Sequence, residues 1–391
     1  MTKLSSLLLS LAVLGACAEG PAEPASGAVD VVVAASLSSE VPGVEQRVGS
    51  TGPGALYALY KPAGWQGRLV VYAHGYVAPD APVALPEIDP LRDALLAQGI
   101  AVAYSSYSEN GYALKDGAQR TKQVRELFVD RFGAPAHTYL VGHSLGGAVA
   151  LSLAEKHPSL WSGVLPMCGV VGGSSLEFDY LWNLRVLFDA FFPGTLPGDA
   201  MRVPADLDWE GQALPTIVEA ISARPDLLYA LSRVEQSGLR EMPPENLGEA
   251  VVQALWFQLH GTNDVLGRTH GRSPFDNTAT WYSGSSDDEA LNAAVQRVSS
   301  SRSAEKWAER YFEPTGRLSV PTIMLHTTRD PVVPIAHETA YAAVAAAAGG
   351  DAMLVQRTVD AFGHCTFPAE EQLRALQDLI VWAEYGAKPG P

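Results

Sequence analysis

The feature that most constrains this chain is an alternation of short apolar runs with longer helical stretches, which begins near residue 55. Runs of strand length occupy 69–73, 100–104, 138–141, 164–167, 322–325 and 353–355, and helical stretches occupy 91–98, 116–132, 145–157 and 372–385. Strands that alternate with helices build a mostly parallel sheet with helices on both faces. The sequence therefore predicts an α/β fold, and an apolar run at 31–35 is expected to begin its first strand.

One long interval breaks this alternation. About 150 residues rich in Trp, Phe and Pro separate the strand at 164–167 from the strand at 322–325. Helical stretches are expected at 181–192, 213–222 and 290–310, because an unstructured loop of this length is implausible in a compact protein. We therefore expect a mainly helical lid at 173–318, inserted between a first part of the core at 30–172 and a second part at 319–391. The aromatic side chains of this interval would line an apolar pocket or form the lid's own core. They are Phe178, Tyr180, Trp182, Phe188, Phe191 and Phe192.

The pentapeptide Gly142-His143-Ser144-Leu145-Gly146 fits the pattern G-x-S-x-G, in which a strand turns sharply into a helix. An apolar strand precedes it and a helix follows it, as the pattern requires. The glycines permit a close approach of backbones that a side chain would block. N–H groups at the start of the helix would stabilise an oxyanion. These features predict that Ser144 is a nucleophile.

A serine hydroxyl needs a base, and the base needs an acid that orients it. In this kind of site the acid and then the histidine follow the serine along the chain. His364 lies between a strand and the last helix, and Asp330 follows the strand at 322–325 within a proline-bracketed loop. We expect Ser144, Asp330 and His364 to form a catalytic triad. Asp360, in the same loop as His364, is the alternative acid.

The second oxyanion donor is expected from the loop that follows the strand at 69–73, which reads Ala73-His74-Gly75-Tyr76. We expect the backbone N–H of Tyr76 to act together with the N–H of Leu145. His74 is more simply explained as a structural residue that holds this loop.

Together these motifs resemble those of the α/β-hydrolase superfamily from about residue 55 to residue 385. The resemblance implies a serine hydrolase that needs no cofactor and no metal, and the superfamily includes esterases, lipases and peptidases. Cys365, directly after the histidine, also resembles tannases and feruloyl esterases, which join that cysteine to one directly before the nucleophile. His143 stands there in this chain. Cys168 would substitute for it, which implies a Cys168–Cys365 disulfide.

Hydrolysis of a small or polymeric carboxylic ester through an acyl-enzyme is the reaction that these residues favour. A peptidase resembling prolyl peptidases is the alternative enzyme, because the same triad cleaves amides and Glu109 or Glu177 would hold a substrate amine. A third alternative is a binding protein that has this fold but no catalytic activity. No metal-ligand spacing, P-loop or dinucleotide fingerprint occurs in the sequence.

The first residues have the features of a targeting segment. An apolar run at 4–14 is too short to span a bilayer, and Leu14-Gly15-Ala16-Cys17 resembles the lipobox of bacterial lipoproteins. We expect a signal peptide at 1–16, lipid attachment at Cys17 and a flexible tether at 17–29. The protein would then be exported and anchored to a membrane of the cell envelope.

The net charge of −16, from 43 acidic and 27 basic residues, repels phosphate backbones and argues against nucleic-acid binding. There are three cysteines in the sequence. If Cys17 carries a lipid, two cysteines remain, and an even remainder in an exported protein hints at one disulfide.

Overall fold

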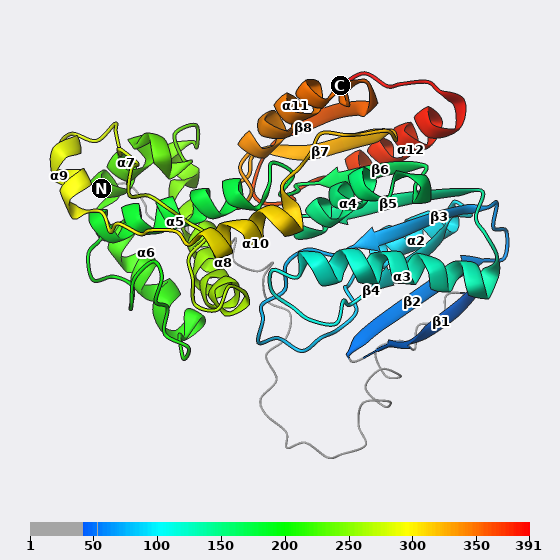
Figure 1. Ribbon diagram of the computed structural model, residues 1–391, viewed down its shortest axis with the longest axis horizontal. Helices are drawn as coiled ribbons and strands as arrows, with labels where there is room; N and C mark the ends of the chain where they lie inside the picture. The colour runs from blue at the N-terminus through cyan, green and yellow to red at the C-terminus, as the bar shows by residue number, and fades with distance from the viewer. Residues whose placement is uncertain (1–41, 53) are drawn as a thin grey trace, which may run out of the picture. The chain divides into compact units, whose positions relative to one another are not determined.

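Within the described residues, eight strands form one mixed sheet in the order β1-β2-β4-β3-β5-β6-β7-β8 (Figure 1). The computed structural model describes residues 42–391 except residue 53. The strands are β1 (Val44–Thr51), β2 (Ala55–Pro62), β3 (Arg68–Ala73), β4 (Ala101–Ser105), β5 (His137–His143), β6 (Gly163–Met167), β7 (Thr322–Arg329) and β8 (Leu354–Phe362). β1 pairs antiparallel with β2, and β2 pairs antiparallel with β4, whereas all the other pairs are parallel.

The strands at the centre of the sheet are apolar because they are covered on both faces. Leu69, Val70 and Val71 of β3 are completely buried, as are Ala101 and Val102 of the neighbouring β4. Such continuous apolar runs are typical of parallel sheets enclosed by helices. The observed sheet confirms the predicted α/β fold class.

In the part of the chain that the structure describes, five helices connect or follow the strands of this sheet. They are α2 (Asp89–Ala97), α3 (Leu114–Phe132), α4 (Leu145–Lys156), α11 (Ala336–Ala348) and α12 (Ala369–Tyr385). α4 packs against α3 and against β5 and β6, while α12 packs on β6 and β7. Within the described part of the chain, no helix combines the length and the apolar character needed to cross a bilayer.

The segment between β6 and β7 is helical. It contains α5 (Ser174–Phe191), α6 (Leu214–Ala223), α7 (Pro225–Arg233), α8 (Leu247–Arg268), α9 (Asp288–Ala294) and α10 (Arg302–Phe312). In Figure 1 these helices form a green and yellow group that is distinct from the sheet. We call this group the helical insertion. It falls inside the segment predicted at 173–318, and its action as a lid stays a prediction.

One sequence-based expectation for the insertion was wrong in detail. The helix expected at 290–310 is two helices, because the chain between α9 and α10 is extended and pairs with a distant residue. There, the N–H of Val298 donates to Asn277 Oδ1 at 2.6 Å, and the N–H of Asn277 donates to the Val298 carbonyl at 3.1 Å. In addition, α7 and α8 were not predicted from the sequence.

The predictions for the N-terminal region lie outside the described residues. They are the signal peptide at 1–16, lipid attachment at Cys17, the tether at 17–29 and the strand at 31–35.

Candidate active site

Ser144 lies at the sharp turn between β5 and α4, with φ 55° and ψ −123°. A positive φ is rare for a residue with a side chain, so the surrounding structure must hold this turn. The N–H of Ser144 donates to the Met167 carbonyl of β6 at 2.9 Å. A Cβ atom at Gly142 would collide with the Gly146 carbonyl, and one at Gly146 would collide with the Ala73 carbonyl. The two glycines therefore permit the backbones to meet around the serine.

Side chains from three strand ends form one hydrogen-bonded chain. Ser144 Oγ lies 2.8 Å from His364 Nε2, and His364 Nδ1 lies 2.7 Å from Asp330 Oδ2. The other carboxylate oxygen of Asp330 accepts hydrogen bonds from the N–H groups of Val332 and Val333 at 2.9 and 3.0 Å. Because the ionised Asp330 can only accept, Nδ1 of His364 carries the proton and Nε2 faces the serine as an acceptor.

Asp360, the alternative acid, lies elsewhere. Its side chain is 83% exposed and is paired with Arg329, and it also accepts a hydrogen bond from Thr328 at 3.2 Å. The side chain of Asp330, in contrast, is completely buried. The structure therefore brings Asp330, and not Asp360, to His364.

A disulfide joins Cys168, directly after β6, to Cys365, directly after His364. It closes a separation of 197 residues in the sequence. The histidine loop is also held by Thr327, whose hydroxyl donates to the Gly363 carbonyl at 2.8 Å. Cys168, His364 and Cys365 have donor atoms close enough for a metal ion, but the two sulfurs are bonded to each other. We therefore interpret the group as a covalent brace for the histidine loop.

The expected oxyanion donors lie on either side of the serine. Leu145 is the first residue of α4, and the backbone before Tyr76 passes so close that a Cβ at Gly75 would lie 3.2 Å from Ser144 Cβ. Within residues 42–391 other than 53, neither the N–H of Tyr76 nor that of Leu145 donates a hydrogen bond. Both donors are therefore available to a bound group.

His74 anchors the loop that carries Tyr76. Its Nδ1 donates to the Gly75 carbonyl at 2.8 Å, and its ring stacks on Tyr107 with the centroids 3.7 Å apart. The hydroxyl of Tyr107 donates back to the His74 carbonyl at 3.0 Å. Burial lowers the pKa of His74, which keeps the ring neutral in this structural role.

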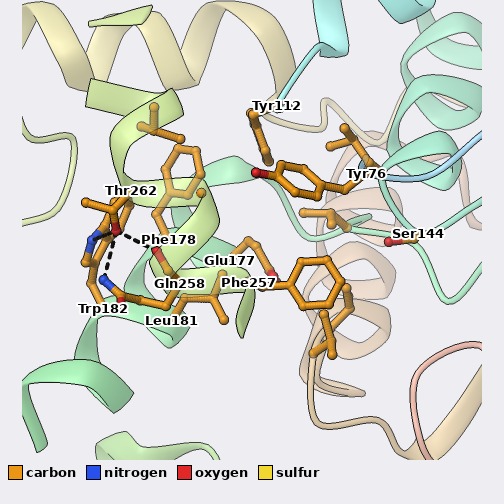
Figure 2. A pocket seen from close by; sticks show the side chains of 16 residues that line it. Tyr76, Tyr112, Ser144, Glu177, Phe178, Leu181, Trp182, Phe257, Gln258 and Thr262 are labelled. Carbon is orange, nitrogen blue, oxygen red and sulfur yellow. Dashed lines mark hydrogen bonds between the residues drawn. The ribbon is translucent and has the colours of Figure 1, made fainter. Parts of the chain in front are cut away.

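A narrow cavity of about 50 Å³ begins beside Ser144. The sheet side contributes Ser144, Leu145, Val170, Val332 and Val333, the loops contribute Tyr76 and Tyr112, and the helical insertion contributes Glu177, Phe178, Leu181, Trp182, Phe257, Gln258, Gly261, Thr262 and Val265. In Figure 2 the rings of Tyr76 and Phe257 lie between Ser144 and the group formed by Trp182, Gln258 and Thr262. Most of these side chains are apolar, so the cavity suits an apolar group.

The aromatic residues predicted to line a pocket or to form the lid's own core are divided between these two roles. Phe178 and Trp182 line the cavity, whereas Phe188 and Phe192 stack on each other with centroids 5.0 Å apart. The hydroxyl of Tyr180 donates to the Pro331 carbonyl at 2.6 Å, which ties α5 to the loop of the acid.

α8 was not predicted from the sequence, although it supplies five of the cavity residues. Its buried positions include Ala250, Val251, Ala254, Leu255 and Leu259, at the three- and four-residue spacing of an amphipathic helix. That spacing is visible in the sequence and was the signal that could have revealed the helix.

The two acids considered for binding an amine are both engaged in contacts. Glu109 forms an ion pair with Arg268 at 2.9 Å. Glu177 lines the cavity and is only 5% exposed, and its Oε2 lies 3.0 Å from His337 Nε2. Burial raises the pKa of Glu177 well above its ordinary value, so this carboxyl favours its neutral form.

Comparisons with known proteins agree with this architecture. A tannase-like family of unknown function matches residues 52–210, which include Tyr76, Ser144 and Cys168. No curated protein matches the sequence significantly. An esterase from Aspergillus oryzae superposes with a TM-score of 0.50 at 12% identity, covering 90% of this chain and 88% of that one. Feruloyl esterase B from the same organism gives a TM-score of 0.49 at 13% identity, with coverage of 88% and 82%. The chain therefore has the α/β-hydrolase fold, as the sequence predicted.

Proposed function

We propose that this protein is a serine hydrolase that cleaves carboxylic esters through an acyl-enzyme. The observation that carries the proposal is the hydrogen-bonded chain from Ser144 Oγ through His364 to the buried Asp330. That chain ends beside an apolar cavity and two free N–H donors. A nucleophile, a base, an acid and an oxyanion site in contact are the parts that acyl transfer requires.

In the proposed reaction, Ser144 Oγ attacks the ester carbonyl while His364 Nε2 takes its proton. The N–H groups of Leu145 and Tyr76 stabilise the oxyanion, and Asp330 stabilises the imidazolium. His364 then returns the proton to the leaving alcohol, and the acyl group stays on the serine. Water attacks this acyl-enzyme with the same histidine as base, which releases the acid and restores Ser144.

Hydrolysis of an amide is the rival chemistry, and the contacts of Glu109 and Glu177 weigh against a peptidase that binds a cationic amine. Glu109 is already paired with Arg268, and Glu177 favours its neutral form. A matched ester and amide of the same acyl group separate the two activities, and faster turnover of the amide would favour the peptidase.

The test of the main proposal combines a fluorophosphonate probe with p-nitrophenyl esters of increasing acyl length, on wild type and Ser144→Ala. We expect the probe to label wild type only and turnover to fall by at least about 10⁴-fold in the variant. If wild type is not labelled and hydrolyses no ester, the hydrolase proposal fails and a binding protein on this fold becomes the better explanation.

We also propose that the protein is exported and tethered to a membrane through a lipid on Cys17. The sequence Leu14-Gly15-Ala16-Cys17 supports this proposal. Incorporation of labelled palmitate into wild type, and its loss in Cys17→Ser, is the expected result. Equal labelling of both proteins would contradict lipid attachment at this cysteine.

A further inference from the structure

A second histidine lies directly behind the acid of the proposed triad. His326 of β7 is completely buried, and its Nε2 lies 3.7 Å from Asp330 Oδ2 while donating to the Val333 carbonyl at 2.8 Å. Its Nδ1 lies 3.1 Å from Glu338 Oε1 on α11. His326 is therefore placed between two carboxyl groups, and the hydrolytic steps described above use neither His326 nor Glu338.

The carboxyl group of Glu338 is itself held from a third element. Gln356 of β8 donates through Nε2 to Glu338 Oε2 at 2.7 Å. The polar contacts thus extend from Ser144 at the cavity, through the acid, to the interface between α11 and β8. The other titratable groups near His326 are His337 of α11, Glu177 of α5 and His364.

Charge balance indicates which form His326 adopts. Two ionised carboxylates buried this close together are costly unless a cation lies between them. Burial alone would lower the pKa of His326, but the hydrogen bond and charge of Glu338, together with the charge of Asp330, raise it above its ordinary value. The adjacent His337 differs, because burial lowers its pKa to about 3 and keeps it neutral.

We propose that His326, held as an imidazolium by Glu338, is a positioning residue that keeps the Asp330 carboxylate directed toward His364. The inference rests on the proposed function, because His326 acts on the reaction only through Asp330. Nε2 of His326 donates to the Val333 carbonyl, and the N–H of Val333 donates to Asp330 Oδ1, so the imidazolium also fixes the loop that holds the carboxylate.

A fixed cation behind Asp330 has a consequence for pH dependence. It opposes the placement of a second positive charge on His364, which must be neutral to accept the proton from Ser144. Removal of the cation makes His364 easier to protonate, so the acidic limb of the kcat/KM profile moves to higher pH. A charge as close to His364 as the His326 imidazolium shifts the acidic limb by about one pH unit.

The test compares His326→Gln and Glu338→Gln with wild type, with His337→Gln as the matched control. All three substitutions replace a buried titratable side chain with an uncharged one, but His337 carries no charge to lose. We expect the acidic limb to move upward in His326→Gln and Glu338→Gln and to stay in place in His337→Gln. If neither of the first two variants moves the limb, while thermal stability alone falls, the pair has only a structural role.

Nitrogen-15 NMR of labelled histidines gives a measurement that needs neither turnover nor a stable variant. In wild type near pH 7, His326 should carry protons on both ring nitrogens. A neutral His326 would overturn the inference even if esters are hydrolysed. A charged His326 in a protein that is not labelled by the fluorophosphonate and cleaves no ester would instead overturn the hydrolase proposal and leave the buried ion pair intact.

Discussion

The two walls of the cavity beside Ser144 are built differently. On the sheet side, Ser144, His364 and Asp330 contact one another through short hydrogen bonds at the ends of strands. On the side of the helical insertion, the wall consists mostly of apolar side chains of α5 and α8, and Oε2 of Glu177 has no well-directed hydrogen bond within the part of the chain that the structure describes. The sheet wall is therefore specified by local backbone geometry, and the insertion wall by packing between distant segments. Reaction chemistry should depend on the first wall and substrate choice on the second.

The strongest test of the sheet wall is Asp330→Asn. The amide retains the size of the side chain but loses the charge that stabilises an imidazolium and fixes the tautomer of His364. We expect kcat to fall by about 10³- to 10⁴-fold, measured with the best p-nitrophenyl ester. Substrate binding should change little, because the side chain of Asp330 does not line the cavity.

Asp360→Asn is the control for that substitution. Asp360 lies on the surface beside Arg329, and an exposed ion pair contributes little to stability. We expect activity within about twofold of wild type. A large loss in Asp360→Asn together with normal activity in Asp330→Asn would show that Asp360, and not Asp330, is the acid.

Removal of the disulfide should have the next largest effect, because it releases the loop of His364 from β6. Cys168→Ser and Cys365→Ser both break the same bond, so we expect them to behave alike. Loss of a cross-link over this separation typically costs about 2–4 kcal/mol in stability. Thermal unfolding and kcat/KM, each measured with and without a reductant, provide the check. A reductant that lowers the melting temperature of wild type to that of the variants, without affecting them further, would identify the disulfide as the cause.

The same contrast explains what the sequence could predict. Ser144, Asp330 and His364 follow strands within short motifs, so their places at the sheet edge follow from local patterns. The Cys168–Cys365 pair came from a resemblance that this chain satisfies only with a shifted cysteine. α8 was not predicted although its apolar spacing is visible, and the helix expected at 290–310 is interrupted by a contact with Asn277. Contacts between residues far apart in the sequence decide the cysteine pairing and the break at 290–310, and a local pattern does not contain them.

Leu181→Ala tests whether the insertion wall selects the substrate. Leu181 lines the cavity, whereas Leu187 on the same helix is completely buried away from it. Since the cavity measures about 50 Å³, we expect wild type to prefer short acyl groups. The extra space in Leu181→Ala should raise kcat/KM roughly tenfold for an ester two carbons longer than the wild-type optimum.

Leu187→Ala is the matched control. It should lower stability by about 2–5 kcal/mol through a void in the core of the insertion, and it should leave the preference for acyl length unchanged. If both variants shift the preference equally, the cavity next to Leu181 is not the acyl site.

The smallest effect is expected for Glu177→Gln, as a change in the pH dependence of stability. Burial raises the pKa of Glu177 in the folded protein above its ordinary value of 4.5, so folding favours the bound proton. This stabilisation is fully present below the unfolded pKa and is lost as the pH rises through the folded pKa. Glutamine cannot ionise, and it keeps the size of the side chain. The melting temperature of wild type should therefore fall relative to that of Glu177→Gln as the pH rises above 4.5. Parallel curves over that range would mean that Glu177 is ionised in the folded protein, and the insertion wall would then present a negative charge to the substrate.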